Sequence, residues 1–284
     1  MGELDWPVKR GGVAVLSLDD ERIDWRPGTG EDDRFQVASV TKLLTSLAAL
    51  AAVEAGKLGL DDEPDDERVP AGATVRHLLA HASGVPAEMG DVQSVRGTRG
   101  RQPGQRRVYS NAGYRILAEV VERAVGSGFG EWLGTSVLEP LGMTSTELGP
   151  YGGVGHDPAA GAVTTLPDLA MLAGCLLERG KPVVSRPLFD DAVTVQFPGL
   201  AGLVPGVGRY DPCDWGLGPE LKDGKDNHWM GGARSPETFG HFGRSGCFVW
   251  VDPVAELAAV AVTDRNFDDE GWGMRVWPGW SDAL

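Results

Sequence analysis

The chain has 284 residues, of which 42% are hydrophobic, and a formal net charge of −15 at pH 7. This length suits one large domain, or two lobes that share a site, around a substantial core. The acidic balance argues against binding to nucleic acid or to anionic membrane surfaces, and no apolar run reaches the roughly 18 residues that span a bilayer.

The first ten residues carry no apolar segment of the kind found in secretory signals. The three cysteines (Cys175, Cys213 and Cys247) are an odd number without metal-type spacing, and the histidines have no partner spacing either. We therefore expect a cytoplasmic protein with reduced, structural thiols and no metal site.

Residues 12–18 and 22–26 are predicted to form two strands joined by an acidic turn. An extended Phe-Gln-Val-Ala run then leads into Ser39, and Lys42 follows three residues later. About three turns of almost purely apolar helix come next, which indicates a buried helix that ends near Gly56 or Gly59.

Residues three apart share one face of a helix, so Ser39 and Lys42 should lie side by side at its N-terminus. The unsatisfied N–H groups there carry a partial positive charge. A hydroxyl beside an amine at such a position is a candidate activated nucleophile. The alternative is that Ser39 only caps the helix and Lys42 is a surface residue, because a lone S-x-x-K pattern recurs by chance.

The middle of the chain is predicted to be mainly helical. A loop over 60–70 precedes a short helix over 74–84, and residues 85–108 look irregular. Further helices are expected from Asn111 to about 126, over 129–138, over 165–180 and after Ser185, with a glycine-rich loop over 144–163. The irregular stretch carries Arg96, Arg99, Arg101, Arg106 and Arg107, which either face an anionic group or belong to a solvated loop.

From about residue 206 the pattern returns to β structure. Residues 215–218 look strand-like, residues 219–237 look like a polar loop, and residues 247–252 and 257–262 are predicted to form two adjacent buried strands. The tail from Gly271 has a broken helical pattern. We therefore expect an α/β (α+β) fold, with one lobe built from residues 1–60 and 206–284. Residues 61–205 would form an inserted, mainly helical lobe, and the site would lie between the two.

Three motifs stand in order at the edges of these elements: Ser39-Val-Thr-Lys42, Tyr109-Ser-Asn111 and His241-Phe-Gly243. With them, nearly the whole chain resembles the serine β-lactamase and penicillin-binding-protein superfamily, in particular its class C, D-alanyl-D-alanine peptidase and esterase branch. Further matching stretches are Leu78 to Gly84, Pro103-Gly104, Pro140 to Met143, Thr164 to Leu169 and Trp250 to Pro253. The resemblance implies an antiparallel sheet flanked by helices, an inserted all-α lobe and an active site between lobes, without a cofactor.

The resemblance also implies the role of each site residue. Ser39 would form an acyl-enzyme, with Lys42 and Tyr109 as a coupled acid–base pair in which either is a candidate base. Asn111 would orient Lys42 and bind the acyl-side carbonyl. The backbone N–H groups of Ser39 and Arg244 would hold the oxyanion, and Gly243 would let the strand approach the substrate. Lys222-Asp-Gly224 is a rival third motif, but no strand follows it.

His241 stands where β-lactamases usually carry lysine, which puts efficient β-lactamase activity in doubt and is similar to peptidase and esterase members. The sequence therefore predicts a serine hydrolase that acts on small carboxylic esters. The alternatives are a D-amino-acid peptidase or amidase, a weak β-lactamase, a biosynthetic acyltransferase and a non-catalytic ligand-binding relative. The expected partner is a small ester, amide or β-lactam-like molecule, and the sequence sets no oligomeric state.

Overall fold

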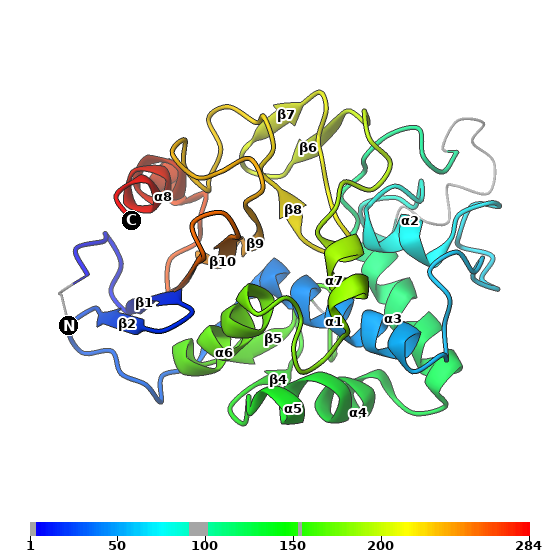
Figure 1. The fold of residues 1–284 in the computed structure, drawn as a ribbon, viewed down its shortest axis with the longest axis horizontal. Helices are drawn as coiled ribbons and strands as arrows, with labels where there is room; N and C mark the ends of the chain where they lie inside the picture. The colour runs from blue at the N-terminus through cyan, green and yellow to red at the C-terminus, as the bar shows by residue number, and fades with distance from the viewer. Residues whose placement is uncertain (1–3, 91–101, 153–154) are drawn as a thin grey trace.

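The computed structural model describes residues 4–90, 102–152 and 155–284. Its main sheet is antiparallel throughout, in the order β2-β1-β11-β10-β9-β8, so that strands from the two ends of the chain lie together (Figure 1). The six strands are β1 (Gly11–Ser17), β2 (Glu21–Trp25), β8 (Glu220–Leu221), β9 (Phe239–Gly243), β10 (Cys247–Asp252) and β11 (Leu257–Thr263). The register places Gly12 opposite Val262, which joins the first strand to the last.

Two smaller sheets accompany the main one. They are β3-β5-β4, made of β3 (Phe35–Gln36), β4 (Glu147–Leu148) and β5 (Ala162–Thr164), and the hairpin of β6 (Gly202–Val204) and β7 (Gly208–Tyr210). The longer helices are α1 (Thr41–Glu54), α3 (Asn111–Val125), α6 (Leu166–Leu177) and α8 (Trp272–Asp282). The shorter ones are η1 (Ala38–Val40), α2 (Val75–Leu79), α4 (Phe129–Leu133), η3 (Gly134–Leu138), α5 (Glu139–Leu141), α7 (Arg186–Ala192) and η4 (Asp269–Gly271).

The central strands are buried on both faces, which explains their continuous apolar runs. In β10 every residue is buried, and the side chains alternate between two clusters. Val249 and Val251 face the larger cluster, which α1, α3 and α6 cover, whereas Phe248 and Trp250 face a second, aromatic cluster. The sheet is therefore the middle layer between two apolar cores.

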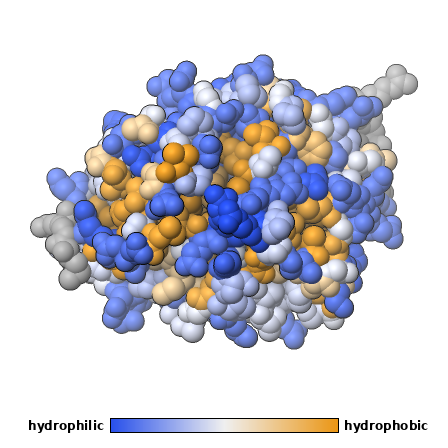
Figure 2. All heavy atoms as spheres, viewed as in Figure 1, coloured by the Kyte–Doolittle hydropathy of each residue, from blue (hydrophilic) through white to orange (hydrophobic). Residues whose placement is uncertain are grey.

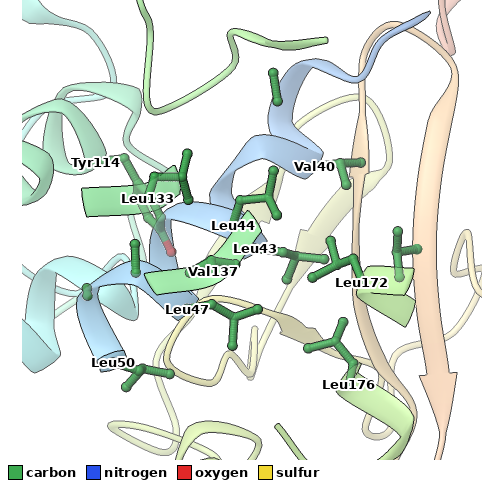
Figure 3. Close-up of a cluster of buried hydrophobic side chains, with 14 of the residues drawn as sticks. Val40, Leu43, Leu44, Leu47, Leu50, Tyr114, Leu133, Val137, Leu172 and Leu176 are labelled. Atoms are coloured by element: carbon green, nitrogen blue, oxygen red, sulfur yellow. The ribbon is translucent and has the colours of Figure 1, made fainter. Parts of the chain in front are cut away.

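Helix α1 runs through the larger core. All its residues from Thr41 to Ala52 are buried, as its apolar composition predicts. Figure 3 shows Leu43 and Leu47 extending toward Leu172 and Leu176 of α6, while Tyr114 of α3 lies on the other side of the helix. Because neighbours surround α1 on every side, its N-terminus is held in a fixed position.

The predicted fold class is confirmed, and the boundaries of the two lobes at residues 60 and 206 remain a prediction. Several local predictions were wrong. The helix predicted over 74–84 ends at Leu79, because His81 adopts a left-handed conformation with φ +55°. Residues 215–218 form only an isolated bridge through Trp215, and the predicted polar loop over 219–237 contains the buried strand β8.

The loop predicted over 144–163 also contains β4 and the first residues of β5. These strands are too short to give a periodic signal, since they exist only through pairing with β3 and with each other. On the face shown in Figure 2, hydrophilic surface is interspersed with apolar residues. Within the described residues, none of the helices has the length and apolar composition needed to cross a bilayer.

Candidate active site

Ser39 lies in the single turn η1, directly ahead of α1. The residue before it, Ala38, is buried and has φ +45°, a left-handed conformation that residues with a side chain adopt rarely. Thr41 fixes this turn, because its Oγ1 donates to the carbonyl of Ala38 at 2.6 Å and accepts from the N–H of Ala162 at 2.9 Å. The half-buried serine is thus presented on a bend that is tied to β5.

Lys42 is fully buried and contacts three oxygen atoms. Its Nζ lies 2.6 Å from Asn111 Oδ1, 2.8 Å from the carbonyl of Ala159 and 3.4 Å from Ser39 Oγ. The same nitrogen lies 4.7 Å from the centre of the Tyr109 ring. Burial is the main cause that lowers the pKa of Lys42 to about 7. A large fraction of the amine is therefore neutral near pH 7 and able to accept a proton.

A closed circuit of hydrogen bonds holds the two oxygen atoms that lie nearest to this amine, Asn111 Oδ1 and the carbonyl oxygen of Ala159. Asn111 Nδ2 donates to Glu88 Oε1 at 2.6 Å, and Glu88 Oε2 accepts from Arg115 at 3.0 Å. Arg115 also makes a two-pronged contact with Asp157, at 3.1 and 2.8 Å. Asp157 in turn accepts from the N–H of Ala159 at 2.9 Å. The circuit orients the Asn111 amide with its oxygen toward the lysine.

Tyr109 Oη lies 3.5 Å from His241 Nε2. His241 Nδ1 lies 2.8 Å from the carbonyl of Phe242, which can only accept, so Nδ1 carries the proton and Nε2 is the acceptor. Burial lowers the pKa of His241 to about 3, with a further contribution from Lys42, so the imidazole is neutral. Burial also raises the pKa of Tyr109 well above its usual value, against the effect of a hydrogen bond with Ser39. The phenol is thus protonated.

His81 supports Tyr109 from behind. The two rings lie 4.5 Å apart, and His81 Nδ1 accepts from the backbone N–H of Ser110 at 3.1 Å. Ser110 caps α3 by accepting from the N–H of Gly113 at 2.8 Å. His81 therefore packs and hydrogen-bonds directly against the Tyr109-Ser-Asn motif.

Strand β9 passes against the turn that carries the serine. A Cβ at Gly243 would lie 2.1 Å from the carbonyl oxygen of Val37 and 3.1 Å from Ala38 Cβ, so only glycine permits this approach. Arg244 follows, and its exposed side chain pairs with Asp268 at 3.1 Å. The backbone of Arg244 thus reaches the serine side of the cleft, and its role as an oxyanion donor remains a prediction.

Two hollows meet at Ser39, and Tyr109 and Arg244 line both. The apolar pocket has a volume of about 220 Å³ and is lined by Ser39, Tyr109, Val204, Pro205, Gly206, Trp215, Glu220, His241, Phe242, Arg244, Phe267 and Asp268. The second hollow, which we call the polar groove, has a volume of about 740 Å³. Its lining includes Glu88, Gln105, Arg106, Asn111, Leu203 and Arg209.

The structure brings all seven predicted site residues to this junction, and it adds others that the sequence did not reveal. Glu88, Arg115 and Asp157 had no recognisable spacing, because three separate segments supply them. The rival motif lies elsewhere: Asp223 lines a separate hollow of about 710 Å³ on another part of the molecule.

The arginines of the irregular stretch divide into three groups. Arg96, Arg99 and Arg101 lie outside the described residues. Arg106 and Arg107 both line the polar groove, but the Arg107 guanidinium donates to the carbonyls of Cys213, Ala80 and Gln196, so it has a structural role. Among the described residues, there is no group of three or more His, Cys, Asp or Glu side chains placed to hold a metal ion.

A model of the β-lactamase family matches residues 7–276. The chain belongs to the β-lactamase family. Among curated proteins, penicillin-binding protein 4* of Bacillus subtilis is 33% identical over 137 residues, which is 40% of this chain and 30% of that protein. Protein flp of Staphylococcus aureus (strain MRSA252) is 26% identical over 215 residues, or 63% of this chain and 40% of that protein. The matches thus span less than half of these relatives.

Two solved structures match the chain over nearly its whole length. One titled a β-lactamase, from Mycobacterium bovis, is 44% identical with a TM-score of 0.86, and the match covers 98% of this chain and 94% of that one. EstCE1, titled a hydrolase with promiscuous acyltransferase activity, is 18% identical with a TM-score of 0.76, over 98% and 94% of the two chains. The second likeness shows the fold alone.

The predicted superfamily is therefore confirmed. The family match does not set the activity or the substrate of this chain.

Proposed function

We propose that this protein is a serine hydrolase that forms an acyl-enzyme on Ser39 and acts on small carboxylic esters. The observation that carries the proposal is the position of Lys42, whose fully buried amine lies 3.4 Å from Ser39 Oγ. Burial lowers the pKa of that amine to about 7, so near pH 7 a large fraction of it is uncharged and able to accept a proton. A serine hydroxyl is inert until such a base takes its proton.

In the proposed acylation, Lys42 Nζ takes the proton of Ser39 Oγ while the oxygen attacks the ester carbonyl. A new bond forms between Ser39 Oγ and the carbonyl carbon, and the backbone N–H groups of Ser39 and Arg244 hold the oxyanion. When the intermediate collapses, the bond from carbon to the alcohol oxygen breaks and Tyr109 donates a proton to that oxygen. Lys42 then returns its proton to Tyr109.

In deacylation, water attacks the acyl carbon and gives up a proton to the same pair. The bond between Ser39 Oγ and carbon breaks, the acid leaves, and Oγ regains a proton. The raised pKa of Tyr109 favours it as the acid and the lowered pKa of Lys42 favours it as the base, since each group is then in the protonation state that its step needs.

His241 favours an uncharged ester over a β-lactam. The β-lactam carboxylate is bound in related enzymes by a lysine at this position, whereas burial keeps His241 neutral, with its pKa lowered to about 3. β-Lactamase activity is nevertheless a second candidate, because the 44% identical structure bears that title. A chromogenic cephalosporin assayed beside the esters distinguishes the two.

The test is the intact mass of the protein after treatment with a fluorophosphonate, combined with rates on small esters. We expect one adduct on the native protein and none on Ser39→Ala, whose esterase rate should fall on the order of 10⁴-fold or more. The control is Ser46→Ala, the same change about two turns further along the chain. Ser46 is a buried serine in α1, and its hydroxyl contacts that of Tyr114 at 3.1 Å. Full esterase activity in a folded Ser39→Ala protein would refute the mechanism.

A further inference from the structure

The two hollows that meet at Ser39 differ in size and in the side chains that line them. The walls of the apolar pocket are formed by Val204, Pro205, Trp215, Phe242 and Phe267, and its volume is about 220 Å³. The polar groove is more than three times as large, at about 740 Å³. A substrate whose carbonyl carbon lies at Ser39 must place one of its two substituents in each hollow, because the substituents diverge from that carbon.

The proton donor decides which substituent enters the apolar pocket. A leaving oxygen must lie within hydrogen-bond reach of its acid, and the proposed acid is Tyr109. The hydroxyl of Tyr109 lies 3.5 Å from His241 Nε2, and His241 and Trp215 line the apolar pocket but not the polar groove. Asn111, on the lysine side of Ser39, lines only the polar groove. The leaving oxygen is therefore directed toward the apolar pocket.

We propose that the apolar pocket is the binding site for the leaving alcohol, and that it selects esters of compact, apolar alcohols no larger than about one aromatic ring. This inference rests on the proposed function, and it names the substrate class of the same site. An apolar cavity of about 150 Å³ accommodates benzene. A pocket of about 220 Å³ holds a benzyl or short branched alkyl group and excludes two fused rings.

The polar groups of the pocket leave its interior available to apolar atoms. The carboxylate of Glu220 is already engaged, by His228 at 2.9 Å and by the indole N–H of Trp229 at 2.8 Å. Arg244 and Asp268 pair with each other, and their exposed side chains place this ion pair at the rim. Inside, the Phe242 and Phe267 rings lie 4.6 Å apart, which gives the pocket a packed aromatic wall.

Two adjacent residues of β6 provide a matched test. Val204 lines the apolar pocket and Leu203 lines the polar groove, because successive side chains of a strand point to opposite faces. Rates are measured for two ester series. One series holds the acyl group constant and varies the alcohol from ethyl to butyl, isobutyl, benzyl and naphthylmethyl, and the other holds the alcohol constant and lengthens the acyl chain.

For the native protein we expect kcat/KM to rise about fourfold for each methylene added to the alcohol, which corresponds to about 0.8 kcal/mol per buried methylene. The rise should stop at benzyl, and kcat/KM should fall for naphthylmethyl. Val204→Ala should shift the optimum toward the larger alcohols and leave the order of rates in the acyl series unchanged. Leu203→Ala changes the groove for the acyl group and should leave the order of rates in the alcohol series unchanged. Phe267→Leu, which also enlarges the pocket, repeats the test at a second residue should Val204→Ala fail to fold.

A shift in the acyl series with Val204→Ala would overturn the proposal and assign the pocket to the acyl group. A flat alcohol series that neither Val204→Ala nor Phe267→Leu changes would also overturn it. Failure of the proposed function has a different signature, since no ester would then be cleaved and the fluorophosphonate would leave Ser39 unmodified.

Discussion

The surroundings of Lys42 explain why it is the proposed base. Its amine has no exposed surface, and desolvation disfavours the charged form. Charges in the surrounding hydrogen-bond circuit then change the pKa of Lys42 further. Asp157 and Glu88 raise the pKa of Lys42, and Arg115 lowers it. The residues that position the acceptors of Lys42 therefore also set the pH at which it works.

The pH profile of kcat/KM tests this role. We expect kcat/KM to fall as the pH drops below about 7, since the proposed mechanism requires neutral Lys42 and the amine gains a proton there. This falling part of the profile is its acid limb. Arg115→Gln removes a positive charge, so the ammonium is stabilised and the limb should move to higher pH by roughly half a unit or more. Glu88→Gln removes a negative charge, so the limb should move to lower pH.

Arg115→Lys is the control, because it keeps the charge and loses only the two-pronged contact with Asp157. Its limb should stay near that of the native protein even if its maximal rate declines. Limbs that move in the same direction in Arg115→Gln and Glu88→Gln would contradict the assignment of Lys42 as the base.

At the scale of elements, the site depends on the contact between β9 and the turn η1. The two glycines of β9 are equally crowded but against different neighbours. A Cβ at Gly243 would meet the backbone of Val37 at 2.1 Å, next to the serine, whereas a Cβ at Gly240 would meet the carbonyl of Val249 in β10 at 2.2 Å. The contact at Gly243 determines where β9 meets the turn that carries Ser39, whereas the contact at Gly240 lies inside the sheet.

Alanine substitutions at these two glycines separate catalysis from stability. Both should lower Tm by several degrees, because each forces a backbone shift. Only Gly243→Ala should also lower kcat/KM, by about 10²-fold or more, because it displaces the serine turn from the predicted oxyanion donor at Arg244. The measurements are thermal melts and ester rates, taken well below both melting temperatures. An equal loss of activity in Gly240→Ala would mean that general sheet distortion is the cause.

The long elements of this fold were predictable because each carries a strong local signal. Helix α1 follows from its apolar sequence, α3 from its amphipathic pattern, and β10 and β11 from continuous buried runs. The two-residue strand β8 was not predictable, since Glu220 is acidic and is buried only because His228 and Trp229 hydrogen-bond to its carboxylate. Such partners are brought together only by the folded chain.

The same distinction applies to the candidate site. Ser39, Lys42, Tyr109, Asn111 and His241 were found through short motifs, in which spacing along the chain reflects spacing in the fold. Glu88 and Arg115 carry no such pattern, because their importance arises from the orientation of Asn111 in three dimensions. Motifs thus identified the proposed reacting groups, and only the structure identified the residues that hold them in place.

At the scale of the whole molecule, the aromatic cluster joins the two ends of the described chain. Trp6 packs against Trp272 and Trp280, with ring centres 5.9 and 5.4 Å apart, and against Phe248 of β10 at 6.3 Å. The N-terminal segment and α8 therefore cover the face of the sheet opposite α6, and both the first and the last elements contribute to one core.

This arrangement predicts a large effect from a residue far from Ser39. Trp6→Ala should lower the free energy of unfolding by about 3–5 kcal/mol, because it leaves a cavity among the aromatic rings. Denaturant titration measures the loss, and Val254→Ala, at a side chain that is 64% exposed, should stay within about 0.5 kcal/mol of the native value. A similar small change for Trp6→Ala would mean that the N-terminal segment contributes little to the core.

The division of the cleft into an apolar pocket and a polar groove also bears on the fate of the acyl-enzyme. On the proposed assignment, the molecule that releases the acyl group arrives where the alcohol departed, because the second half-reaction retraces the first with a new nucleophile. Water gains little from the aromatic walls of that pocket, whereas an alcohol that fills it gains binding energy. The acyl-enzyme would then persist in water and partition toward a returning alcohol, so that the same geometry that selects a leaving group also makes the enzyme prone to exchange one ester for another.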